Sequence, residues 1–259
     1  MNIKSIKNIV TAAASEELLP RFNKIEFSHK ADGSVITEAD FAMQNRIEKE
    51  LRNLHPEISF LGEEMNEDEQ KSIIDSGMPF WCLDPLDGTL NFSTGFPVFS
   101  VSLALIENRM PILGIVYDPV RDECFYAEQD KPAYLNDTPL EKKPSAPLAR
   151  GVGMIDMKRL GEDLYLRFYR ERPFSSQRSI GSVALEWCWL AAGRAHVYLH
   201  GRQNLWDYAA GYLIFRQAGG YACTLEGKEF FSGELKASSA VGACTKELFL
   251  EWKEWLKID

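Results

Sequence analysis

Two aspartates, Asp84 and Asp87, stand three residues apart directly after the apolar segment 81–83. Pro85 fixes one backbone angle between them, and Gly88 permits a tight turn immediately after them. Two carboxylates held this close repel each other unless a cation lies between them, and hard oxygen ligands suit Mg²⁺ or Mn²⁺. Backbone N–H groups at the following turn could hold a phosphate. The segment therefore predicts metal-assisted phosphate chemistry.

Three further acidic residues could join this pair, and each also has an ordinary structural interpretation. Asp40 follows Thr37 at the spacing of a helix capping box, and Asp207 stands where a helix N-cap is expected. Glu63 could be a solvated strand end in an acidic stretch. For the pair at 84 and 87 the alternative is an Asx-type turn, but such a turn does not require two carboxylates against an apolar strand. The pair is therefore the strongest chemical signal.

The composition narrows the class of protein. The chain has 259 residues, 45% hydrophobic content and a net charge of −9, which is enough for one large catalytic unit or two closely packed halves. No Lys/Arg-rich block is present, so we expect no nucleic-acid partner. Five cysteines without a C-x-x-C pair favour a reduced, cytoplasmic protein over a disulfide framework. No signal peptide or long apolar segment is visible, so we also expect no membrane association.

The hydrophobic pattern changes once along the chain. Helical spacing in the first 54 residues is followed by short strands and, from 99 to 135, by alternation typical of an antiparallel meander. The polar stretch 65–77 is predicted to be a mobile loop. Strands and helices alternate after the proline-bearing segment 142–147, which we take as the boundary between an N-terminal half, 1–143, and a C-terminal half, 144–259.

Four segments, in order, resemble the motifs of the inositol monophosphatase family within the lithium-sensitive, Mg²⁺-dependent phosphatases. They are DGSVITEAD at 32–40, GEE at 62–64, DPLDGTLNF at 84–92, and WDYAAG at 206–211 with AGG at 218–220. The resemblance spans roughly residues 5 to 245. It implies a layered α-β-α-β-α sandwich, with an antiparallel sheet in the N-terminal half and a mixed sheet in the C-terminal half. It also implies a homodimeric phosphoric monoester hydrolase.

The same resemblance implies roles for individual residues. One Mg²⁺ would be held by Glu63, Asp84 and the carbonyl of Leu86, a second by Asp84, Asp87 and Asp207, and a third, weaker ion would lie beside Glu63. Mn²⁺ is a possible substitute. Glu63 and the Thr89 hydroxyl would position the attacking water, Asp40 would orient Thr89, and the N–H groups of Gly88 and Thr89 would bind phosphate. No covalent phosphoenzyme is implied.

Substrate contacts are less closely specified. The turn Gly181-Ser182 lies near the ligand's ring in relatives, although it could be an ordinary helix start. Animal inositol monophosphatases carry a glutamate that contacts inositol where His200 aligns, so His200 is either a substrate contact or a plain loop residue. Asp207 would also face the substrate, and Arg202 could meet a second phosphate or be solvated.

We therefore expect hydrolysis of a small polyol or sugar phosphate resembling inositol 1-phosphate. A 3′(2′),5′-bisphosphate nucleotidase or fructose 1,6-bisphosphatase remains an alternative of the same superfamily. The nucleotidases usually have Lys-Glu after D-G-T, whereas this chain has Leu90-Asn91. A phosphate- or metal-binding regulator is an alternative of another class, and the presence of Glu63 and Thr89 argues against it.

Overall fold

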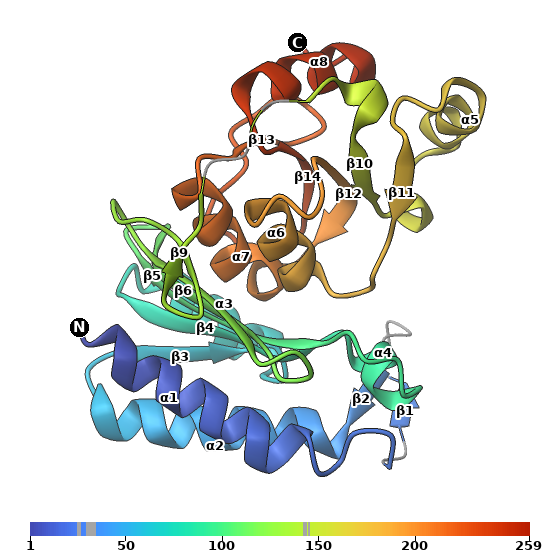
Figure 1. Cartoon of the computed structure of the whole chain (residues 1–259). Helices are drawn as coiled ribbons and strands as arrows, with labels where there is room; N and C mark the ends of the chain where they lie inside the picture. Colours follow the sequence, from blue (N-terminus) through green and yellow to red (C-terminus); the bar gives the residue numbers. More distant parts are fainter. Residues whose placement is uncertain (25–26, 30–34, 142–143, 145) are drawn as a thin grey trace.

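The computed structural model describes residues 1–24, 27–29, 35–141, 144 and 146–259. In this part of the chain the elements form five layers (Figure 1). Helices α1 (Ile3–Ala13) and α2 (Glu38–Leu54) cover one face of a seven-stranded sheet. Helices α6 (Val183–Ala191) and α7 (Leu205–Gln217) separate that sheet from a five-stranded one, and α8 (Lys246–Leu256) covers the far side. The predicted α-β-α-β-α sandwich is confirmed.

The larger sheet is mixed rather than wholly antiparallel. Its order is β3-β4-β5-β6-β7-β8-β9. The strands are β3 (Ser59–Gly62), β4 (Phe80–Asp87), β5 (Ser100–Glu107), β6 (Met110–Asp118), β7 (Glu123–Glu128), β8 (Tyr134–Leu135) and β9 (Thr138–Pro139). All neighbours from β4 onward are antiparallel, but β3 runs parallel to β4. The prediction of an antiparallel sheet was wrong at this edge, because the connection between β3 and β4 is long enough to cross over.

The smaller sheet has the order β11-β10-β12-β14-β13. Its strands are β10 (Val152–Ile155), β11 (Ser176–Arg178), β12 (Val197–Gln203), β13 (Tyr221–Cys223) and β14 (Ser238–Ala243). Strand β10 is parallel to β11 and β12, whereas β14 is antiparallel to β12 and β13. The predicted mixed sheet is therefore confirmed. The division at 143/144 stays a prediction, and part of the expected boundary segment lies outside the described residues.

The remaining elements are short or lie at the periphery. They are β1 (Phe27–His29), β2 (Val35–Thr37), α3 (Glu67–Asp75), α4 (Thr89–Ser93), α5 (Glu162–Glu171), the π-helical turn η1 (Ala14–Leu18) and the 3₁₀ turns η2 (Leu148–Arg150) and η3 (Met157–Arg159). Helix α3 contradicts the mobile loop predicted at 65–77. Asn66 caps it by accepting a hydrogen bond from the Glu69 N–H, and three acidic residues in its first turn favour the helix N-terminus.

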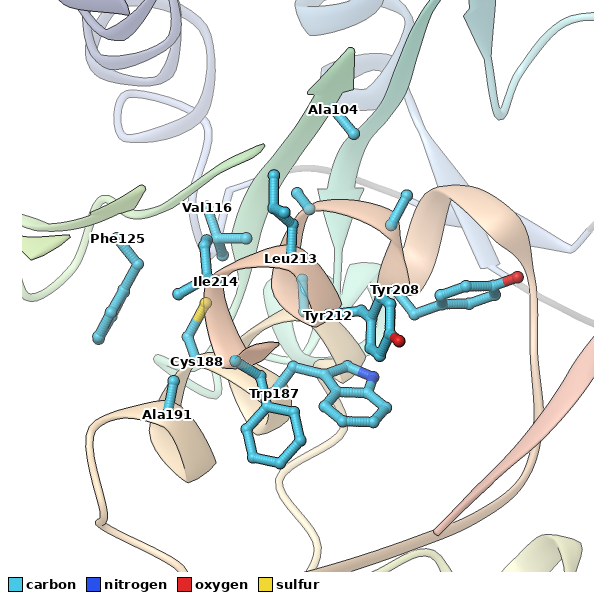
Figure 2. Close-up of a cluster of buried hydrophobic side chains, with 14 of the residues drawn as sticks. Ala104, Val116, Phe125, Trp187, Cys188, Ala191, Tyr208, Tyr212, Leu213 and Ile214 are labelled. Carbon is cyan, nitrogen blue, oxygen red and sulfur yellow. The ribbon is translucent and has the colours of Figure 1, made fainter. Parts of the chain in front are cut away.

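The central helices pack tightly against the larger sheet. Figure 2 shows Trp187 and Cys188 of α6 beside Tyr212 and Ile214 of α7, in the cluster that also includes Val116 of the sheet. Glycines permit this close approach. A Cβ on Gly114 of β6 would lie 2.8 Å from the Ala210 carbonyl oxygen, and one on Gly211 would lie 2.7 Å from the Trp187 Cβ. Trp187 is completely buried at the centre of this contact.

Within the described residues, no helix has the combination of length and apolar character needed to cross a bilayer.

Candidate active site

The acidic pair lies on the strand itself, at the carboxyl end of β4. All eight residues of β4 are buried, because α2 covers one face of the sheet and α7 the other. Asp84 pairs with Ser102 and Asp87 with Ser100, and the register of β4 against β5 shifts between these two pairs. This irregularity interrupts the regular pairing at the end of the strand, between the two aspartates.

Asp87 joins the two halves of the molecule. Its Oδ2 accepts hydrogen bonds from the Ser182 hydroxyl at 2.5 Å and the Ala184 N–H at 2.8 Å, while Oδ1 accepts from the Val183 N–H at 3.1 Å. These donors form the first turn of α6, so a carboxylate of the N-terminal half caps a helix of the C-terminal half. Burial raises the pKa of Asp87 to about 6, against the lowering effect of these donors.

Asp84 has fewer compensating contacts. Its Oδ1 accepts a hydrogen bond from the Leu86 N–H at 3.0 Å. Burial raises the pKa of Asp84 well above its usual range, and the charges of Glu63, Asp87 and Asp207 raise it further. Four carboxylates from three separate parts of the chain thus act on one another.

Glu63 is presented by a turn at the end of β3. Gln70 of α3 donates to the Gly62 carbonyl at 2.8 Å, and Gln44 of α2 accepts from the Glu64 N–H at 3.1 Å. A Cβ on Gly62 would lie 2.1 Å from the Gln44 Oε1, so a larger residue here would displace the Gln44 amide that accepts from the Glu64 N–H. The segment predicted as a mobile loop therefore contributes α3, whose Gln70 fixes the backbone beside Glu63.

Thr89 and Asp40 meet as the family pattern implied they would. The Thr89 hydroxyl lies 3.2 Å from Asp40 Oδ1 and 3.0 Å from the Leu86 carbonyl oxygen. The other oxygen of Asp40 accepts from both the N–H and the hydroxyl of Thr37, each at 2.7 Å, so the predicted capping box is present as well. Burial raises the pKa of Asp40 to about 6. Asp40 thus serves as a helix cap and as an acceptor for Thr89.

Asp207 is in the first turn of α7, where its Oδ2 accepts from the Asn204 N–H at 2.8 Å. Burial and the charges of Glu63 and Asp87 raise the pKa of Asp207 well above its usual range, while Arg159 lowers it. Asp207 is not the N-cap that we considered: Asn204 is the N-cap, and Asp207 is the third residue of the helix, where it completes a capping box. This capping contact coexists with the electrostatic influence of the other carboxylates on Asp207.

The donor set fits a hard divalent cation. Its members are carboxylate oxygens whose mutual repulsion a cation would relieve. No three or more His, Cys, Asp or Glu side chains among the described residues already converge as a preformed metal site. The ligands Glu63, Asp84, Leu86, Asp87 and Asp207 therefore stay a prediction.

Two glycines bring the halves together beside this strand end. Gly88 has a φ of +95°, and a Cβ there would lie 3.2 Å from the Gly181 carbonyl oxygen. Asn91 of α4 donates to the carbonyls of Val98 and Ile180, both at 2.7 Å. The Ser182 side chain is fully buried and donates to Asp87, so in this structure it supports a carboxylate. A substrate contact by Gly181 or Ser182 stays a prediction.

His200 is neither a loop residue nor openly exposed. It lies in β12 with only 3% of its side chain exposed, and its Nε2 is 3.1 Å from Asp156 Oδ2. The same oxygen accepts from Arg159 Nη1 at 2.5 Å. Burial lowers the pKa of His200 to about 4, so the ring is neutral at pH 7. The interpretation as a plain loop residue was wrong, because the strand extends to Gln203, and a direct substrate contact remains a prediction.

Several supporting residues were not anticipated from the sequence. They are Gln44, Gln70, Ser100, Asp156 and Arg159. Each acts through a contact with a distant segment or through a turn without a distinctive motif. Only the capping pattern of Asp156, which accepts from the Lys158 N–H at 3.1 Å, is local enough to have been found.

Comparison with known proteins agrees with this geometry. Residues 3–252 match the model of the inositol monophosphatase family. The chain belongs to this family. It shares 33% identity with inositol monophosphatase 1 of Solanum lycopersicum over 230 residues, which are 86% of this chain and 84% of that protein. It also shares 33% identity with the fructose-1,6-bisphosphatase/inositol-1-monophosphatase of Thermotoga maritima, over 82% of this chain and 80% of that protein.

The fold agrees with solved structures. The crystal structure of the extragenic suppressor protein suhB from Bartonella henselae superposes with a TM-score of 0.86 at 27% identity, covering 98% of each chain. This chain of the inositol monophosphatase family is a phosphoric monoester hydrolase, and its family is generally metal-dependent.

Proposed function

We propose that this chain is a Mg²⁺-dependent phosphomonoesterase that hydrolyses a small polyol or sugar phosphate. The observation that carries the proposal is the group of carboxylates around the end of β4, in which Glu63, Asp84 and Asp207 act on one another electrostatically. Such a group suits divalent cations and, through them, a phosphate dianion. The name of the Thermotoga maritima relative, which pairs a sugar bisphosphate with inositol 1-phosphate, supports this substrate class.

The proposed ligands of the cations are Glu63, Asp84, Asp87, Asp207 and the Leu86 carbonyl. When bound, two Mg²⁺ ions, or Mn²⁺ in their place, would stabilise negative charge on the entering and leaving oxygens, with a third, weaker ion near Glu63. The hydrogen bonds from α6 to Asp87 and from Leu86 to Asp84 hold these carboxylates in place.

The residues of the chain orient the reaction. The Thr89 hydroxyl has one proton, and donating it to Asp40 leaves its oxygen lone pairs to accept a hydrogen bond from the attacking water. Glu63 accepts the other proton of that water, which directs its oxygen at phosphorus. The N–H groups of Gly88 and Thr89 bind phosphate oxygens. Attack is in line with the leaving alkoxide, and no covalent intermediate forms.

Three further properties belong to the proposal. We expect a cytoplasmic, lithium-sensitive homodimer. None of the five cysteines, all of which lie in the described part of the chain, forms a disulfide, which is consistent with a reducing compartment. A regulatory role alongside catalysis is compatible with the same residues.

The test is phosphate release from four compounds with Mg²⁺ and with a chelator in its place. The compounds are inositol 1-phosphate, fructose 1,6-bisphosphate, 3′-phosphoadenosine 5′-phosphate and NADP. Metal-dependent turnover of inositol 1-phosphate or fructose 1,6-bisphosphate far above the other two supports the proposal. Preference for 3′-phosphoadenosine 5′-phosphate would identify a nucleotidase. Metal binding without any release would favour a regulator.

A further inference from the structure

Glu186 is a buried acid outside the group of carboxylates described above. It lies in α6, only 2% of the residue is exposed, and its Oε1 accepts a hydrogen bond from the Ile180 N–H at 3.1 Å. Burial raises the pKa of Glu186 to about 7. Burying a carboxyl group destabilises a fold unless the group is hydrogen-bonded, and an apolar residue at this position would avoid the cost. Packing alone therefore does not account for a glutamate here.

Ile180 is hydrogen-bonded through both of its backbone groups. Its N–H donates to Glu186, and its carbonyl oxygen accepts from Asn91 Nδ2 at 2.7 Å. The same nitrogen of Asn91 donates to the Val98 carbonyl, also at 2.7 Å. Asn91 lies in α4, whose first residue is Thr89. Hydrogen bonds therefore connect Glu186 in the C-terminal half, through Ile180, with the helix that carries Thr89 in the N-terminal half.

The turn that follows Ile180 makes the contacts with Asp87. Gly181 has a φ of +72°, and its carbonyl oxygen would lie 3.2 Å from a Cβ on Gly88. The Ser182 hydroxyl donates to Asp87 at 2.5 Å, and the N–H groups of the next two residues donate to it at 3.1 and 2.8 Å. A displacement of Ile180 would therefore shift the donors of Asp87 and the backbone that packs against Gly88.

Resting on the proposed function, we propose that Glu186 is a positioning residue, whose hydrogen bond to the 180–182 turn keeps Asp87 oriented for the cation and α4 oriented for the phosphate. Glu186 acts through Ile180 and does not itself hold either group. Partners that orient metal-ligating side chains typically contribute about 10- to 100-fold to metal affinity or activity. Because Glu186 acts by accepting one hydrogen bond, an acceptor of the same shape can replace it, whereas an apolar side chain cannot.

The experiment measures kcat/KM for the preferred compound of the four named above and, by calorimetry, the affinity for Mg²⁺. Glu186→Leu fills a similar space without an acceptor and should lower both values about 10- to 100-fold. Glu186→Gln keeps an oxygen for the Ile180 N–H, so both values should stay within about 3-fold of the unaltered enzyme. Leu190→Ala is the control, because Leu190 is similarly buried one turn later in α6. It should lower the unfolding temperature without changing kcat/KM.

A double-mutant cycle tests the connection through Ile180. Asn91→Ala removes the donor to the Ile180 carbonyl from a half-buried position. If both side chains act by placing Ile180, the double variant with Glu186→Leu should lose little more activity than the more impaired single variant. Losses that multiply would contradict the inference. Asn91→Ala also keeps the test available if Glu186→Leu does not fold, since unchanged turnover in Asn91→Ala would contradict the inference as well.

The outcomes separate this inference from the proposed function. Unchanged turnover in Glu186→Leu, or equal impairment in Glu186→Gln, would overturn the inference while the proposed function stands. If the unaltered enzyme hydrolyses none of the four compounds, the proposed function fails and hydrogen exchange of the metal-free protein decides the inference. Faster exchange of the Val183 and Ala184 amides in Glu186→Leu than in Leu190→Ala supports it, because these amides donate to Asp87. Equal exchange contradicts it.

Discussion

Charged groups are arranged in opposite ways at the end of β4 and around Asp156, which contacts Arg159 and His200 beside β12. Around Asp84 lie three other carboxylates, one on the same strand and two from other segments, and burial and mutual repulsion raise the pKa of Asp84. Around Asp156, a guanidinium and an imidazole contact one carboxylate oxygen at 2.5 and 3.1 Å. Buried like charges are stable only with a ligand from outside, whereas a matched pair fixes geometry. The first region is therefore suited to binding a cation and the second to positioning a side chain.

The sharpest way to break this comparison is Asp84→Asn. The amide can still accept the Leu86 hydrogen bond but loses the charge, so we expect kcat/KM to fall by roughly 10³-fold or more while the fold is retained. Thermal unfolding without metal should occur at the same temperature or higher, since one repelling charge is gone. Asp163→Asn on exposed α5 is the control. Near-normal turnover in Asp84→Asn would show that this carboxylate is no metal ligand.

Metal addition should have the next largest effect. At a Mg²⁺ concentration about 100 times Kd, binding adds about 2.7 kcal/mol to the free energy of unfolding. For a chain of this size we expect a rise of about 5–10 °C in Tm, reversed by chelator. Differential scanning calorimetry measures it, and Asp84→Asn should show a much smaller rise. An equal rise in that variant would place the cation away from β4.

Burial of His200 beside Asp156 should make the free energy of unfolding depend on pH. The unfolded chain protonates His200 near pH 6.5 and the folded chain only near pH 4, so the free energy of unfolding falls as pH drops between these values. The slope due to this group is about 1.4 kcal/mol per pH unit. His200→Gln should have a shallower slope in urea unfolding between pH 6.5 and 5. Identical slopes would mean that His200 does not titrate as a buried neutral ring.

The smallest expected effect concerns the support of Glu63. Asn66→Ala removes the N-cap of α3 and should lower the free energy of unfolding by about 1 kcal/mol. Hydrogen exchange of α3 should accelerate more than that of α8. Unchanged exchange would mean that the cap contributes nothing to the order of this segment.

The sequence was informative wherever a contact is local or a motif is long. The segment around Asp84 predicted phosphate chemistry, and the family match agrees with a phosphatase. The capping box of Asp40 is present as expected. The layered fold followed from the resemblance together with the change from helical to alternating patterns.

The rest depended on contacts between distant segments. No sequence pattern near Asp156 predicts that its carboxylate will contact His200, a buried residue 44 positions later. Helix α3 was not predicted, because the polar N-cap and the acidic first turn of the helix have the same composition as a polar loop. The parallel pairing of β3 with β4 was missed for the same reason, since pairing direction depends on the path between strands.

The hydrogen bonds of Asp87 also determine when the site can form. Its donors on α6 lie 95 to 97 residues later in the chain, and Ile180 lies 89 residues after Asn91. At about 5–20 residues per second, synthesis of that interval takes roughly 5–20 s, during which β4 exists without its partners. Contacts of such sequence separation form late in folding. On the proposed mechanism, the nascent N-terminal half is therefore expected to be inactive until α6 and α7 have been made and have packed against β4.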